Sequence, residues 1–125
     1  MKSYFILYIS DQQAVTDFYA AVLGVGPRLN VPGMTEFELN DGAVLGLMPE
    51  QSASRLLESK IDTSNLQQNP CAEIYLIVDE PSAYHARAIA AGAKEVSPLS
   101  TRDWGHEAAY SIDISGHVLA FAREL

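Results

Sequence analysis

Apolar and polar positions follow two different periodicities in the first half of the chain. Residues 4–9 form a short apolar run that is typical of a strand. Ser10 and Asp11 follow, and either can cap the start of a helix, while Gly24 supplies a left-handed stop. Between these signals, apolar side chains recur at helical spacing and share one face: Val15, Phe18, Tyr19, Val22 and Leu23. Three extended segments follow, at 27–31, 35–39 and 43–48, with an Asp-Gly turn before the last.

The second half of the chain repeats this order. Residues 73–78 form another strand-like run, and Pro81 suits the first turn of a helix that ends at Gly92. Asp79 and Gly92 are 13 positions apart, as are Asp11 and Gly24. Extended segments follow at 94–97, 108–113 and 117–123, with a Ser-Gly turn before the last. The pattern therefore predicts an α+β fold of two tandem βαβββ modules.

A polar segment separates the two modules. We expect one domain over residues 1–125, with a first module at 1–49, a linker at 50–70 and a second module at 71–125. Within the linker, residues 55–59 suggest a helical turn. A linker of this length in so small a protein is often functional or mobile.

Composition narrows the class of protein. The net charge of −8 disfavours binding to a phosphate backbone, so we expect no nucleic-acid partner. The single cysteine, Cys71, cannot form an intrachain disulfide and has no catalytic setting, which fits a reducing compartment. No apolar stretch is long enough for a membrane helix, and no signal peptide is visible. These features predict a soluble cytoplasmic protein.

The duplicated order and several short segments resemble the glyoxalase/bleomycin-resistance/dioxygenase (vicinal oxygen chelate) superfamily. Residues 102–121 are especially similar to bleomycin-resistance proteins. The resemblance covers nearly the whole chain and rests on these segments: Ile9-Ser10-Asp11, Phe18-Tyr19, Leu23-Gly24, Val78-Asp79, Ala91-Gly92-Ala93, Asp103-Trp104-Gly105 and Asp113-Ile114-Ser115-Gly116-His117-Val118. It implies that each module curls into a partial barrel, that the protein is a homodimer, and that a small molecule binds in the cavity.

Enzymes of this family hold one divalent metal in that cavity. The resemblance places the four ligand positions on Tyr4, Gly46, Glu73 and Ala120. Only Glu73 has a side chain that suits a divalent ion there, and one carboxylate does not make a site. We therefore expect no metal and no cofactor. The three histidines suggest no alternative site, and His85 is expected to be exposed on the second helix.

Strand parity predicts which side chains face the cavity. In the first strand Phe5, Leu7 and Ile9 should pack on the helix, and in the segment 108–113 Tyr110 and Ile112 should be core. The opposite positions and two loop residues form the expected ligand site: Tyr4, Tyr8, Glu36, Glu38, Glu73, Tyr75, Trp104, His106 and Ser111. Rings and carboxylates together suit a flat or cationic organic molecule. The glutamates could equally face solvent, and Trp104 could be either a pocket wall or a hydrophobic plug.

The leading hypothesis is a metal-free binding protein that sequesters a cationic or aromatic antibiotic by stoichiometric capture. The alternative is an enzyme of the same fold, a lyase, isomerase or dioxygenase. It would use shifted metal ligands, or metal-free chemistry with Glu73 or Tyr4 as base or acid. A third possibility is an interaction module whose cavity has collapsed, since one scaffold hosts many functions.

Overall fold

The computed structural model describes residues 2–60, 62 and 72–125. The chain divides into two compact units, one of residues 1–20 and 24–66 and the other of residues 21–23 and 67–125. The elements of the first half are β1 (Ser3–Ile9), α1 (Gln12–Leu23), β2 (Leu29–Val31), β3 (Met34–Asn40), β4 (Ala43–Pro49) and α2 (Glu50–Leu56). Those of the second half are β5 (Glu73–Ile77), α3 (Pro81–Ala90), β6 (Lys94–Thr101), β7 (His106–Ile112) and β8 (Val118–Glu124).

Each half forms a four-stranded sheet with the same topology. The strand orders are β1-β4-β3-β2 and β5-β8-β7-β6. In both sheets the first strand pairs in parallel with the last, and the remaining pairs are antiparallel. The predicted α+β fold and the repeated βαβββ order are confirmed.

The helix boundaries follow the capping signals of the sequence. The Asp11 carboxylate accepts a hydrogen bond from the backbone N–H of Ala14 at 3.0 Å, and Gly24 ends α1 with a φ of 73°. Pro81 occupies the first turn of α3, and Gly92, with a φ of 111°, follows that helix. These φ values are left-handed, and only glycine adopts them without strain.

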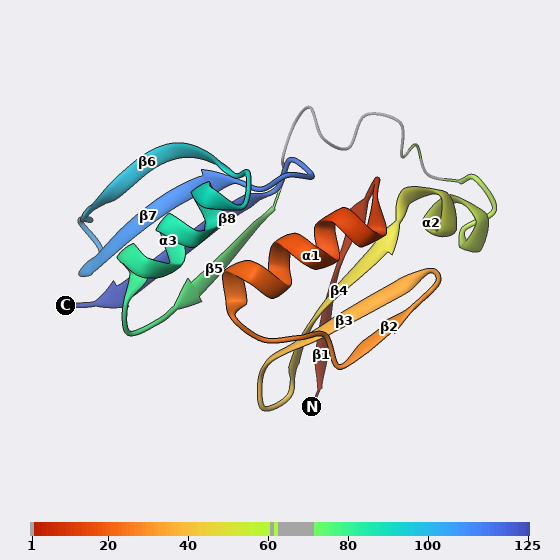
Figure 1. The fold of residues 1–125 in the computed structure, drawn as a ribbon, viewed down its shortest axis with the longest axis horizontal. Helices are drawn as coiled ribbons and strands as arrows, with labels where there is room; N and C mark the ends of the chain where they lie inside the picture. The colour runs from red at the N-terminus through yellow and green to blue at the C-terminus, as the bar shows by residue number, and fades with distance from the viewer. Residues whose placement is uncertain (1, 61, 63–71) are drawn as a thin grey trace. The chain divides into compact units, whose positions relative to one another are not determined.

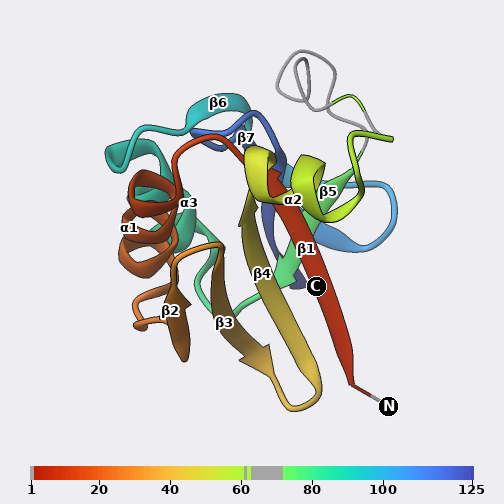
Figure 2. The ribbon, with the colours of Figure 1, turned by 90° about the vertical axis from the view of Figure 1, so that its right-hand side faces the viewer.

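Helix α1 packs on one face of the first sheet (Figure 2). The Tyr19 ring lies 5.0 Å from Phe18 and 6.4 Å from Phe37 on β3, measured between ring centroids. Leu45 and Leu47 share the face of Phe37 and are fully buried. We call the opposite face of this sheet, which the helix does not cover, its open face.

Helix α3 covers one face of the second sheet in the same way (Figure 1). Tyr84 of α3 stacks on Phe121 of β8 at 5.2 Å between ring centroids. The register pairs Phe121 with Ala109, and Leu119 with Ser111, so all four residues lie on the helix-covered face. The face on the other side is the open face of the second sheet.

Three expectations about local structure require correction. Helix α2 begins at Glu50 and not at residue 55, because the chain turns directly from β4 into the helix. His85 is only 7% exposed, and its Nε2 lies 2.8 Å from a Glu95 carboxylate oxygen on β6. Phe5 is 64% exposed and is not packed under the helix as expected.

Two further expectations can be followed only as far as the described residues reach. Cys71 and most of the second half of the linker lie outside the described residues. Among the helices of the described residues, none is long and apolar enough to cross a membrane.

Candidate functional site

The open face of the first sheet carries four of the expected site residues. Tyr4 and Glu38 share a row through Val44, because both pair with that residue in the register. Glu36 lies in the next row, opposite Gly46, and Tyr8 lies further along β1. Strand parity therefore assigned this face correctly.

An arginine that the sequence analysis did not single out reorganises this face. Arg28 donates from Nε and Nη2 to the same Glu36 carboxylate oxygen, at 3.0 and 2.9 Å. Its Nη2 also donates to the Tyr4 hydroxyl oxygen at 2.7 Å. The hydrogen bonding of Arg28 to the Glu36 carboxylate is the main reason that the Arg28 pKa is raised above its usual value. The acidic character expected here is thus compensated at Glu36 and remains only at Glu38.

The turn at Pro32-Gly33 is the signal that could have located Arg28. In the hairpin that it closes, Leu29 pairs with Glu36, and the backbone N–H of Arg28 donates to the Glu36 carbonyl at 2.8 Å, so Arg28 lies beside that glutamate at the edge of the sheet.

The open face of the second sheet brings Trp104, Tyr75 and His106 together. The Trp104 indole N–H donates to the Tyr75 hydroxyl oxygen at 3.1 Å. The same hydroxyl lies 2.8 Å from His106 Nδ1, which can accept its hydrogen when the imidazole proton is on Nε2. Trp104 remains 52% exposed. An indole fixed by a hydrogen bond and still half-exposed offers a flat surface to a ligand.

Strand β7 has the opposite parity to the one expected. Tyr110 and Ala108 lie on the open face, where Tyr110 is 6.4 Å from Tyr75 between ring centroids. Ser111 is fully buried on the helix-covered face and donates to the Leu119 carbonyl at 3.4 Å. The placement of Ser111 on the cavity side was therefore wrong, and Tyr110 takes its place there.

Burial and nearby charges both shift the pKa of the Tyr110 phenol. Burial is the first cause that raises the pKa of its phenol, and the nearby Glu73 carboxylate is the second. Arg102 partly opposes them, since its guanidinium lies 5.1 Å from the Tyr110 ring centroid. Glu73 itself is exposed on this open face.

The family's metal does not fit the corresponding positions in this chain. A Cβ at Gly46 would stand 3.0 Å from Ile6 Cγ1 and 3.4 Å from Met34 Sδ, so apolar atoms fill that space. Ala120 is fully buried, in register with both Tyr75 and Tyr110. Within residues 2–60, 62 and 72–125, no three His, Cys, Asp or Glu side chains gather in a way that could hold a metal ion. The side chains around these positions form an aromatic and apolar surface and do not supply the ligands of a metal centre.

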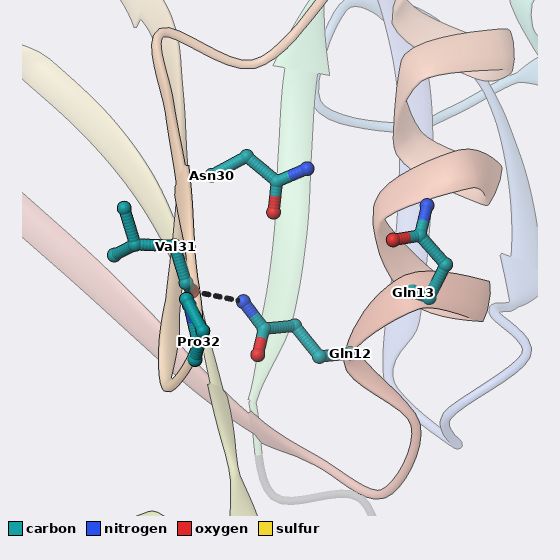
Figure 3. A pocket seen from close by; sticks show the side chains of 5 residues that line it. All are labelled: Gln12, Gln13, Asn30, Val31 and Pro32. Atoms are coloured by element: carbon teal, nitrogen blue, oxygen red, sulfur yellow. Dashed lines mark hydrogen bonds between the residues drawn. The ribbon is translucent and has the colours of Figure 1, made fainter.

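A separate hollow lies between α1 and β2 on the other side of the first sheet (Figure 3). Its volume is about 400 Å³, and its described lining consists of Gln12, Gln13, Asn30, Val31 and Pro32. The Gln12 amide donates to the Val31 carbonyl at 2.7 Å and accepts from the Gly33 N–H at 3.0 Å. These bonds tie the β2–β3 hairpin to the helix, so Gln12 is a structural residue.

Comparisons with known proteins agree with this architecture. The family model described as Glyoxalase/Bleomycin resistance protein/Dioxygenase superfamily matches residues 3–121. A glyoxalase-related enzyme from Fulvimarina pelagi has a TM-score of 0.86 at 21% identity, covering 99% of this chain and 88% of that one. A glyoxalase/bleomycin resistance protein/dioxygenase family enzyme from Burkholderia phytofirmans PsJN has a TM-score of 0.83 at 21% identity, covering 98% of each chain.

A glyoxalase/bleomycin resistance protein from Albidiferax ferrireducens T118 has a TM-score of 0.73 at 18% identity and again covers 98% of each chain. No curated protein matches the sequence. At these identities the solved structures show a shared fold, and the match to the family model shows the family. The chain belongs to the glyoxalase/bleomycin resistance protein/dioxygenase superfamily.

Proposed function

We propose that this protein captures a flat organic molecule on an aromatic open face of one of its sheets, without turnover and without a metal. The observation that carries this function is Trp104, which is half-exposed and held by its hydrogen bond to Tyr75. Stacking on a fixed ring costs little conformational entropy, because the side chain is already ordered. The rings of Tyr75 and Tyr110 enlarge this aromatic surface. Beside them on the same face of the sheet lie three buried alanines: Ala108, Ala120 and Ala122.

Charge favours a ligand with a cationic group. Glu73 and Glu38 are exposed carboxylates on the two open faces, while Glu36 is already paired with Arg28. A cation near these carboxylates gains charge pairing and contact with ring faces. Structural neighbours from Catenulispora acidiphila and Albidiferax ferrireducens bear the name bleomycin resistance protein. Bleomycin, which is cationic and carries flat heteroaromatic rings, is therefore a suitable first probe.

Two measurements test the proposed function. The first is the metal content of the purified protein after exposure to Zn, Ni, Mn and Fe(II), where we expect no stoichiometric metal and no change in melting temperature. The second is the fluorescence of Trp104, the single tryptophan of the chain, during titration with metal-free bleomycin. We expect saturable quenching.

Matched variants identify the surface that binds. Tyr75→Phe removes the hydrogen bond that orients Trp104, and we expect it to weaken bleomycin binding about three- to tenfold. Tyr84→Phe is the control, because Tyr84 lies on α3 against the other face of the same sheet. One tightly bound metal per chain, or unchanged Trp104 fluorescence at saturating bleomycin, would contradict the proposed function.

A further inference from the structure

Arg28 and Tyr4 meet although they come from opposite edges of the first sheet. Tyr4 lies in β1, and Arg28 directly precedes β2. Three strand spacings separate these edges, roughly 14 Å in a flat sheet. The Arg28 Cζ nevertheless lies 5.4 Å from the Tyr4 ring centroid, and Nη2 is 2.7 Å from the hydroxyl oxygen. The two long side chains therefore reach toward each other over the open face, so that part of any ligand bound there would meet them.

The contact determines what the Tyr4 hydroxyl can offer. A phenol has one O–H donor and two acceptor lone pairs, whereas a guanidinium can only donate. Arg28 therefore occupies a lone pair of Tyr4 and leaves its hydrogen available. Tyr4 is 46% exposed, and none of the hydrogen bonds found among the described residues uses that hydrogen. Tyr75 differs, because its hydroxyl accepts from Trp104 and has His106 as an acceptor for its hydrogen.

Glu36 determines the charge of the group that Tyr4 can accept as a partner. Both of its hydrogen bonds from Arg28 end on one carboxylate oxygen, so the arginine's positive charge is compensated locally. Because Glu36 already compensates the Arg28 charge, a ligand carboxylate gains little net attraction there, yet it loses more hydration than a neutral carbonyl oxygen. The cluster is thus an oriented donor in a neutral setting.

We propose that Tyr4, oriented by Arg28, is a specificity-determining donor that binds a neutral carbonyl oxygen, such as that of a ketone or amide, of a ligand held on the open face of the first sheet. This role rests on the ligand-binding function proposed above and adds a chemical requirement to it. The ligand would combine a flat ring system with a hydrogen-bond-accepting oxygen. Arg28 acts as a positioning residue, because it holds the Tyr4 hydroxyl without itself contacting that oxygen.

A matched pair of ligands isolates this hydrogen bond. 2-Acetylnaphthalene carries a ketone, and 2-isopropenylnaphthalene replaces the C=O by C=CH2 with nearly the same shape. We expect calorimetry to show the wild-type protein binding the ketone about three- to tenfold more tightly, the range of one neutral hydrogen bond. Naphthalene-2-carboxylate should bind more weakly than the ketone.

The protein offers a matched control on the same strand and the same face. Tyr4→Phe should abolish the ketone preference, whereas Tyr8→Phe should retain it, since Tyr8 has no contact with Arg28 among the described interactions. Arg28→Gln should reduce the preference, and Arg28→Lys should restore part of it. A ratio of two affinities does not change when a substitution merely lowers stability, so it separates positioning from folding.

The outcomes distinguish this role from the ligand-binding function. Equal binding of the two probes to wild type, or a preference that survives Tyr4→Phe, overturns the role of Tyr4 and leaves the ligand-binding function standing. Tighter binding of the carboxylate overturns the neutral-oxygen requirement. Failure of both probes while bleomycin quenches Trp104 overturns the Tyr4 role alone. Failure of the naphthyl probes and of bleomycin together overturns both.

Discussion

The Thr35 hydroxyl joins β3 to α1 and β2 on the helix-covered face of the first sheet, and its removal makes a quantitative prediction. It accepts from Gln12 Nε2 at 3.0 Å and from Thr16 Oγ1 at 2.9 Å, and it donates to Asn30 Oδ1 at 3.1 Å. Thr35 and Thr16 are buried, whereas Asn30 is exposed and Gln12 also bonds the Val31 carbonyl. Thr35→Val keeps the shape of the side chain and removes all three bonds.

The magnitude follows from what each partner can do afterwards. The Thr16 hydroxyl loses its partner in a buried setting, which costs about 1–3 kcal/mol. The bonds to Gln12 and Asn30 cost roughly 0.5–1 kcal/mol each, because those side chains retain a partner or meet water. We therefore expect Thr35→Val to lower the free energy of unfolding by about 2–5 kcal/mol, and Thr16→Val alone by about 1 kcal/mol.

Urea unfolding of the single and double variants tests this reasoning. The double variant removes the orphaned Thr16 hydroxyl as well, so its loss should be at least about 1 kcal/mol smaller than the sum of the two single losses. Thr101→Val, an exposed position on β6, is the control and should change stability by less than about 0.5 kcal/mol. Additive losses within that margin would refute the shared hydrogen-bond network.

Three further predictions concern single side chains. The raised Tyr110 pKa predicts a phenol that ionises above the usual value near 10, so stability is lost as pH rises from 10 through the raised pKa. Ultraviolet titration should lose a component that ionises above that value in Tyr110→Phe, and no change would contradict the assignment. Because His85 Nδ1 is buried without a hydrogen-bond partner, His85→Phe should lower unfolding free energy by less than about 1 kcal/mol in urea titrations, and a loss above 3 kcal/mol would show an essential polar role. Gly46→Ala should cost about 1 kcal/mol through crowding against Ile6 Cγ1, and it should cost less in an Ile6→Ala background, which lacks that atom. An undiminished cost in that background would contradict the contact.

The open face of the first sheet could be predicted from the sequence, but its chemistry could not. Alternation along β1 and β3 places Tyr4, Glu36 and Glu38 correctly, because one side of each strand carries the residues that pack under α1. The acidic character expected there was only partly right, since Arg28 compensates Glu36. The Arg28–Glu36 pairing depends on a hairpin register, and the Arg28–Tyr4 contact joins opposite edges of the sheet. Neither is encoded in the periodicity of a single strand.

Strand β7 shows why hydrophobicity misassigned one face. Both of its faces are substantially covered, one by α3 and the other by aromatic rings, so apolar residues occur on each. The small residues Ala109 and Ser111 lie beneath the helix and are fully buried, while the larger Tyr110 lies on the open face. On this strand the size of the side chain, and not its hydrophobicity, distinguishes the helix-covered face from the open face. How closely the helix approaches is a property of the packed unit, not of the strand.

The sequence by itself determined the elements, their duplicated order and the superfamily, because caps, glycine stops and strand periodicity act over a few residues. The family resemblance also indicated that the positions of the usual metal ligands lack suitable donors in this sequence. Only the tertiary structure decided which hydroxyl is engaged and which is available. Tyr4 and Tyr75 look alike in the sequence, yet Arg28 occupies a lone pair of one while Trp104 and His106 engage the other. Those partners are distant in the chain, and only folding brings them within hydrogen-bond distance.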